Sequence, residues 1–419
     1  YLIRTNSRGE TLWSKTYGGQ NTDYAWTIAS TTDGGVIIGS HSESAGAGGH
    51  DVQLIKVDAQ GALQWSMVYG GTSADGAYSL KQTYDGGFVV AAHTSSYGEG
   101  QHEIYLIRTD TSGNVLWTKT YGSSGGDFLR ALDFTPDLGF IMVAETYSFG
   151  AEGADIYVVR TDMQGDTLWT RTFGGPGDDF GYSIRLTNDQ NYIIAGHTRS
   201  FGQGQLDALL MKIDDHGEVI WAKTFGGPDE DFAYSVAPTP DGGYILAGGT
   251  KSFAMGGFCD ILCNDIYLIR TDEKGDTLWT RAYGSLGEER GWQVQPAPDG
   301  GYAVLGISTG FGAGAEDFYF IKTDENGNTG CAEKGTQTII GDPVFQLNTT
   351  TTVVNSGLIS EEALMITGSP ETSENTFCQT TNTDAITTVE IFEIFPNPAK
   401  NRLFVLFQLA QPEILEFQL

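Results

Sequence analysis

Short runs of alternating apolar and polar residues, separated by turn residues, follow one another along most of the chain. Four of them lie between residues 266 and 308, namely IYLIRT, TLWTRAY, ERGWQVQPA and GYAVLGIS. Alternation combined with β-branched and aromatic residues is typical of strands, and the intervening Asp, Gly and Pro residues are typical of turns. No window has a sustained helical period. The pattern predicts an all-β protein.

These groups of four runs repeat at a fixed spacing. A tryptophan marks the same place in each unit, with a step of 52 residues four times and then 58: Trp13, Trp65, Trp117, Trp169, Trp221 and Trp279. A turn glycine keeps the same spacing: Gly9, Gly61, Gly113, Gly165, Gly217, Gly275 and Gly327. A period near 50 residues is the signature of a repeat architecture.

Four antiparallel strands per repeat predict a β-propeller, because stacked blades can bury both faces of every sheet. We name the strands of one blade first to fourth, from the predicted axis outward. The first strand has a small residue at one position in five units: Ala25, Ala77, Gly181, Ala233 and Gly291. The loops from the fourth to the first strand and from the second to the third strand then share one face. Seven blades are expected if upstream residues supply two more strands; six blades, closed by the N-terminal strand, are the alternative.

Acidic residues recur at fixed positions of the repeat. One set opens each first strand and comprises Asp23, Asp75, Asp127, Asp179, Asp231 and Glu289. On the innermost strand these carboxylates would form a ring that recruits cations or takes up protons, and oxygen-rich sites suit Ca²⁺. Alternatively, each acid caps a loop of its own blade. A second set lies in the turn after the first strand, where Asp commonly stabilises the turn itself: Asp33, Asp85, Asp137, Asp189, Asp241 and Asp299.

Histidine and cysteine give weaker signals. His41, His93 and His197 share one position in the second strand, but the other repeats lack it, so we expect surface histidines. Cys259 and Cys263 are expected to form a local disulfide, because a lone C-x3-C is a poor zinc site. A second disulfide is expected between the two remaining cysteines, Cys331 and Cys378, and four pairable cysteines fit an oxidising compartment.

The net charge of the chain argues against two classes of binding partner. A formal net charge of -30 argues against nucleic acid and against an anionic membrane surface. No run of about 18 apolar residues is present, so no membrane span is expected. The chain begins inside a strand without a methionine, and we expect that upstream sequence precedes it.

The sequences of the repeats resemble those of known protein families. Units such as PDGGYILAGGT, followed by DIYLIRTDEKGDTLWTRAYG, look like WD40 and kelch blades, and their TDxxGDTLW turn resembles a sialidase-type Asp box, a structural turn. They most resemble a group of secreted bacterial repeat proteins that end in a type IX secretion sorting domain. The tail is similar to the start of such a domain, with Phe395, Pro396, Asn397 and Pro398 as its motif. A generic extracellular β-sandwich is the alternative for the tail.

Three segments follow from this resemblance. We predict a β-propeller over residues 1–330, a Thr-, Ser- and Asn-rich linker over 331–386, and the start of a sorting β-sandwich over 387–419. The resemblance implies export through the type IX machinery to the outer cell surface or the medium.

Three functions remain open. The first is a non-enzymatic module that binds or adheres to a glycan or protein. The second is a hydrolase or lyase acting on polysaccharide, which needs a carboxylate pair set apart from the repeats. The residues that depart from the repeat, Arg130, Glu145 and Arg290, form no recognisable catalytic set. The third is a structural spacer.

Overall fold

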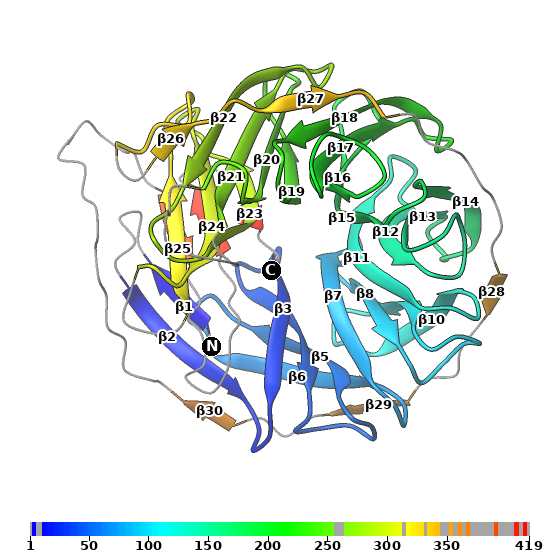
Figure 1. Ribbon diagram of the computed structural model, residues 1–419. Helices are drawn as coiled ribbons and strands as arrows, with labels where there is room; N and C mark the ends of the chain where they lie inside the picture. The colour runs from blue at the N-terminus through cyan, green and yellow to red at the C-terminus, as the bar shows by residue number, and fades with distance from the viewer. Residues whose placement is uncertain are drawn as a thin grey trace. The chain divides into compact units, whose positions relative to one another are not determined.

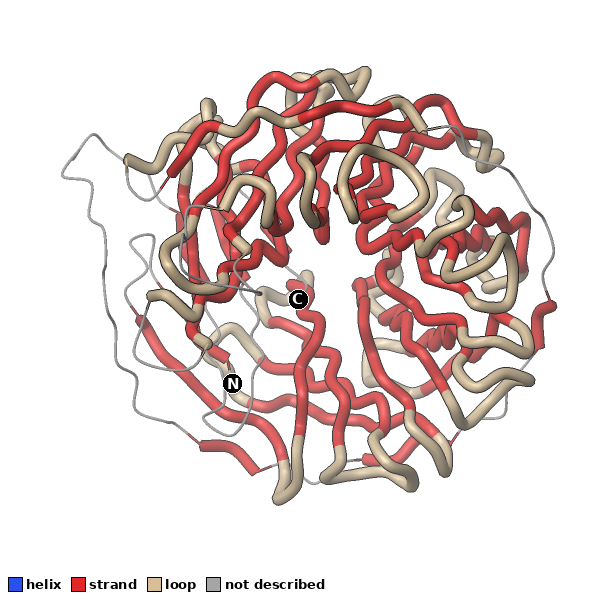
Figure 2. Tube along the Cα trace, viewed as in Figure 1, coloured by secondary structure: helices blue, strands red, loops and turns tan. Residues whose placement is uncertain are grey.

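The computed structural model describes residues 2–5, 11–254, 264–311, 316–330 and 333–343, together with six short strands beyond residue 351. The chain divides into two compact units. The first unit comprises Tyr1–Ala131, Thr351–Ser373 and Ala385–Leu419, and the second comprises Leu132–Thr350 and Glu374–Asp384. Strands and loops account for all of the described residues (Figure 2).

Consecutive strands pair antiparallel to form blade sheets, labelled in Figure 1. The first two sheets are β3 (Asp23–Ser30), β4 (Val36–Ser42), β5 (Asp51–Val57), β6 (Leu63–Gly70), and β7 (Asp75–Gln82), β8 (Phe88–Thr94), β9 (Glu103–Thr109), β10 (Val115–Gly122). The next two are β11 (Asp127–Phe134), β12 (Phe140–Thr146), β13 (Asp155–Thr161), β14 (Thr167–Phe173), and β15 (Asp179–Leu186), β16 (Tyr192–Thr198), β17 (Asp207–Ile213), β18 (Val219–Gly226). The last two are β19 (Asp231–Pro238), β20 (Tyr244–Thr250), β21 (Asp265–Thr271), β22 (Thr277–Tyr283), and β23 (Glu289–Pro296), β24 (Tyr302–Ser308), β25 (Asp317–Lys322).

This is the blade arrangement of a β-propeller with six blades. The predicted strand order, first to fourth, is confirmed in each complete sheet. The first strands of successive sheets pack on one another within a unit, as β15, β19 and β23 do in the second unit. Second and third strands are buried almost throughout, because both of their faces meet neighbouring sheets.

Seven blades do not appear among the residues that the structure describes. The N-terminal strands β1 (Leu2–Thr5) and β2 (Thr11–Gly18) pair with each other, and the described sequence holds no first and second strand to complete their sheet. The alternative of six blades is confirmed, but β2 does not close the last sheet as we expected. The sheet β23–β24–β25 has three strands in the part of the chain that the structure describes.

The recurring tryptophan and glycine contact each other between blades. Gly275 has a φ of +80°, and a side chain there would lie 2.7 Å from the ring of Trp221 in the preceding blade. The same pairing joins Gly217 to Trp169. Glycine is therefore required at these positions for two reasons. The turn has a left-handed backbone conformation, and the indole ring occupies the space that a side chain would need.

A second repeated contact fixes the turn after each first strand. A Lys or Arg of the third strand reaches the turn Asp of its own blade in all six blades: Lys56–Asp33, Arg108–Asp85, Arg160–Asp137, Lys212–Asp189, Arg270–Asp241 and Lys322–Asp299. The cation lies largely buried while the carboxylate is half-exposed. Each acid of this set therefore links its turn to the third strand of the blade, in addition to stabilising the turn itself.

Five short strands after residue 332 add to the outer edges of the blades. They are β26 (Glu333–Gly335) on β22, β27 (Ile339–Gly341) on β18, β28 (Thr352–Val354) on β10, β29 (Ile359–Glu362) on β6, and β30 (Ile366–Gly368) on β2. Each pairs antiparallel with the end of a fourth strand, and successive strands take successively earlier blades (Figure 1). The segment that we predicted as a linker thus supplies edge strands, which pair backbone groups that an edge would leave open.

The tail contributes one further sheet, made of β31 (Val389–Phe392), β32 (Leu406–Leu409) and β33 (Ile414–Glu416). Within its described residues there is no β-sandwich. The predicted sorting motif, Phe395, Pro396, Asn397 and Pro398, lies outside the described residues. So do all four cysteines, Cys259, Cys263, Cys331 and Cys378, and both disulfides stay predictions.

Candidate ligand-binding surface

A β-bulge interrupts the first strand of the blades at one fixed position. In β15 the ladder with β16 passes from Gly181 to Ser183, so the register skips Tyr182. The same shift occurs in four other first strands, and the residue left out is aromatic every time: Trp26, Tyr78, Tyr234 and Trp292. Bulges re-aim a side chain out of the ladder and are frequent beside binding sites. All five side chains are partly exposed.

In the second unit these aromatic side chains contact one another and one phenylalanine on each of two first strands. We call this set the aromatic platform: Phe180, Tyr182, Phe232, Tyr234 and Trp292. Ring centroids are 5.1 Å apart between Tyr182 and Tyr234, and 4.5 Å apart between Tyr234 and Trp292, whose planes differ by 26°. Such contacts hold the rings in place, so the platform is preorganised.

Histidines adjoin the re-aimed aromatics. The ring of His197 lies 5.1 Å from that of Tyr182, and the ring of His93 lies 4.9 Å from that of Tyr78. His41, His93 and His197 are between 6% and 8% exposed, so the expectation of surface histidines is wrong. Burial, together with the nearby His102, His50 and Arg130, lowers the pKa of His93 to about 3. Its imidazole is neutral over the physiological range.

The six acids that open the first strands point to loops of their own blades. Asp179 is typical: its carboxylate accepts from the Gly175 amide at 2.8 Å, from Ser200 Oγ at 2.6 Å, and from the hydroxyl of Thr198. Asp75, Asp127, Asp179, Asp231 and Glu289 are fully buried, and Asp23 is partly buried. This geometry matches the capping role that we gave as the alternative to a cation ring.

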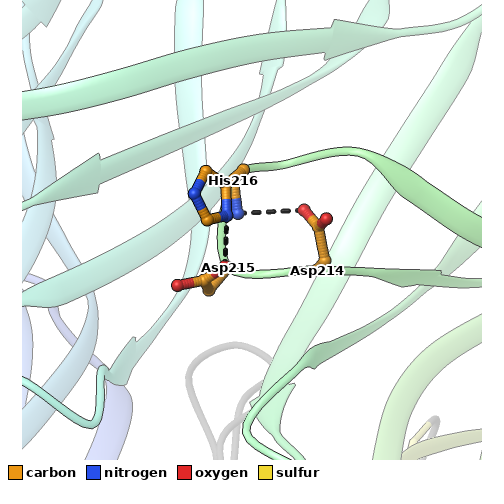
Figure 3. Close-up of side chains that lie close together, drawn as sticks. All are labelled: Asp214, Asp215 and His216. Carbon is orange, nitrogen blue, oxygen red and sulfur yellow. Dashed lines mark hydrogen bonds and ion pairs between the residues drawn. The ribbon is translucent and has the colours of Figure 1, made fainter.

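One exposed group of acids and histidine lies in the turn after β17. Asp214, Asp215 and His216 place one possible ligand atom each within 4.8 Å of one another (Figure 3). Asp214 Oδ1 already accepts from the His216 amide at 2.9 Å, and His216 Nδ1 pairs with Asp215 (Figure 3). These contacts are those of an ordinary Asp turn, and the group gives no support to a metal site.

Of the residues that depart from the repeat, Arg290 has an ion pair in the described part of the chain. Arg290, which lies in β23 with Trp292, pairs with Glu288 in the loop before this strand. Lys251 pairs with Glu230 in the preceding blade junction. What the described residues offer is a partly exposed aromatic surface with charged groups at its border.

The sequence analysis did not predict the aromatic platform, although the bulged aromatic residues recur at one position of the repeat. Trp26, Tyr78, Tyr182, Tyr234 and Trp292 recur with the period of the repeat, three residues after the opening acid. A bulge has no sequence signature at this position, because the aromatic residue reads as one more member of an alternating strand.

Comparison with known proteins does not assign the chain to a family. No protein-family model matches it. A 117-residue stretch is 29% identical to the regulatory protein FlaEY of Caulobacter vibrioides, covering 26% of this chain and 12% of that protein. Among solved structures, Sqt1 of Chaetomium thermophilum is similar with a TM-score of 0.41 and 12% identity, over 70% of this chain and 71% of that one. Puromycin hydrolase gives a TM-score of 0.44 and 14% identity, over 77% of this chain and 48% of that one.

Proposed function

We propose that this protein is a non-enzymatic binding module that recognises a glycan through the aromatic platform. The supporting observation is the repeated bulge, which aims an aromatic side chain out of five first strands while the rest of each strand stays in register. Tyr and Trp provide large, rigid contact areas that lose little side-chain entropy on binding. The electron-rich face of an aromatic ring attracts the C–H groups of a sugar ring.

The acidic surface fits the same proposal. A net charge of -30 does not repel a neutral glycan, whereas it repels acidic polymers. We therefore expect neutral oligosaccharides as ligands. Export by the type IX machinery to the cell surface or the medium remains part of the proposal, on the resemblance of the repeats and of residues 395–398.

A glycan array probed with the purified chain tests this function. Trp292→Ala and Tyr234→Ala should each weaken binding by roughly tenfold or more, since a central aromatic contact commonly contributes about 2 kcal/mol. Tyr84→Ala is the matched control, because Tyr84 is 80% exposed and lies in a turn after a first strand. Trp292→Phe should retain much of the affinity.

Two results would overturn the proposal. One is an array without any signal from the wild-type chain. The other is binding that the Tyr234 and Trp292 substitutions leave unchanged while the Tyr84 control reduces it. Release of shortened sugars during incubation with a bound polysaccharide would instead support the hydrolase or lyase alternative.

A further inference from the structure

Each junction between two blades brings two carboxylates together. The amide of the first residue of a first strand donates to the carbonyl just before the third strand of the preceding blade, as from Asp179 N to Ala154 O at 2.7 Å. The acids that open these two strands therefore lie side by side. Five junctions repeat the arrangement: Asp51 with Asp75, Glu103 with Asp127, Asp155 with Asp179, Asp207 with Asp231, and Asp265 with Glu289. All ten residues are at most 3% exposed.

The junction of Asp155 and Asp179 shows the geometry. Both carboxylates face Gly174 at the end of the preceding fourth strand. A side chain on Gly174 would collide with Asp155 Oδ1 and would lie 3.0 Å from Asp179 Oδ2. Asp155 Oδ2 accepts from the Ala151 amide at 2.5 Å. Asp155 Oδ1 is buried and has no hydrogen-bond partner among the described residues, although the side chain is only 1% exposed.

The surroundings supply no countercharge. Neither Asp155 nor Asp179 forms an ion pair with a Lys or Arg in the described part of the chain. The nearest further acid is Asp178, which accepts from the Ala154 amide at 3.1 Å. Arg199, which lies beside this loop, directs its guanidinium to Glu230 at 3.8 Å. Two buried like charges cannot both ionise at low cost, so the pair needs a proton or a metal ion.

The groups around the pair favour a proton. Those that point at the two carboxylates are hydrogen-bond donors: the amides of Ala151 and Gly175 and the hydroxyls of Ser200 and Thr198. Ca²⁺ instead requires six to eight oxygen ligands directed at it. Both carboxylate oxygens of Asp179 already accept hydrogen bonds. The oxygen left to carry a proton is therefore Asp155 Oδ1.

We propose that the Asp155–Asp179 pair is a buried proton-binding site, with one proton held on Asp155 Oδ1 in mildly acidic solution and released to solvent near neutral pH. A second such site lies at the Asp207–Asp231 junction, where the oxygen without a hydrogen-bond partner among the described residues is Asp231 Oδ1. The electrostatics agree at both places. Burial, with the charges of Asp179 and Asp178, raises the pKa of Asp155 to about 6. Burial, with the charge of Asp207, raises the pKa of Asp231 to about 6.

The direction of the pH effect follows. A carboxyl group whose pKa is raised by folding binds its proton more tightly in the folded state. Its contribution to stability is complete below the pKa of the unfolded chain, about 4, and is lost as the pH rises through about 6. The blade junctions of the second unit should therefore loosen between mildly acidic and mildly alkaline pH.

Thermal unfolding of the full chain from about pH 5 to pH 8 tests the site. The melting temperature of the wild type should fall by several degrees over this range. Asp155→Asn carries a neutral amide that can donate where the proton would, so its profile should be flatter and its melting temperature at pH 8 at least that of the wild type. Glu152→Gln removes an exposed charge from the same loop and should keep the wild-type profile.

A second measurement does not depend on the variant folding. Potentiometric titration of the wild type, native and in concentrated urea, should show more protons bound to the native chain between about pH 5 and pH 6. Equal proton binding would overturn the proposal, as would Asp155→Asn destabilising the chain equally at pH 5 and pH 8. A rise in melting temperature with CaCl₂ at pH 8, reversed by EDTA and absent in Asp155→Asn, would overturn it in favour of a calcium site.

Discussion

Breaking the ion pair between Asp189 and Lys212 should cost stability in a pH-dependent way. Lys212 Nζ lies 2.8 Å from Asp189 Oδ2 and 5.7 Å from the centre of the Tyr244 ring, and the Lys212 side chain is 9% exposed. Partial burial acts to raise the pKa of Asp189. Hydrogen bonds from Lys212, Thr187 and Asn191 and the lysine charge outweigh burial and lower this pKa from 3.8 to about 2.

The magnitude follows from this shift. A lowering of roughly 2 pKa units corresponds to about 2.5 kcal/mol of preference for the ionised form in the folded state. The Asp189 side chain is 53% exposed, so solvent screening reduces the figure to about 1 kcal/mol. Asp189→Asn should therefore lower the free energy of unfolding by about 1–2 kcal/mol at neutral pH, the upper end reflecting a buried lysine left without its carboxylate.

Urea unfolding at a series of pH values is the assay. Because the pKa of Asp189 is lowered, its contribution is present above the unfolded value of 3.8 and is lost as the pH falls through about 2. The gap between wild type and Asp189→Asn should thus shrink from pH 5 towards pH 2. Glu152→Gln controls for loss of one negative charge, and adding Lys212→Met to Asp189→Asn should recover part of the loss. A gap that is absent at pH 7, or that persists undiminished at the lowest pH, would refute the reasoning.

Three further outcomes are expected. Gly275→Val should lower the free energy of unfolding by about 2 kcal/mol or more, since the residue has a φ of +80° and the Trp221 ring leaves no room; urea melts measure it. Thr338→Val should cost about 1–2 kcal/mol in the same assay, because the buried Tyr267 hydroxyl loses the partner that the edge strand segment supplies. The ring resonances of His93 should not titrate between pH 7 and pH 5 in NMR spectra, because burial lowers its pKa to about 3; His93→Gln assigns them.

Alternation and turn residues along the chain were enough to predict the strands, their order within a blade and the repeat. These features are local: alternation sets which residues form a strand, and the Asp and Gly residues of each turn set where it ends. A 52-residue period repeated with little change then requires the same supersecondary unit each time. The capping role of the first-strand acids was also within reach, because Asp179 and the Ser200 and Thr198 hydroxyls recur together in the repeats.

The remaining features could not be predicted from the sequence, because the partners belong to different sheets or to segments far away in the chain. Asp155 meets Asp179 through the stacking of two blades, and His93 is buried by rings from its neighbours. The edge strands after residue 332, with three or four residues each, are too short to show a pattern. Their hydrogen bonds are supplied by the fourth strands that they join. The bulge at Tyr182 depends on a register between strands, which one strand's residues do not encode.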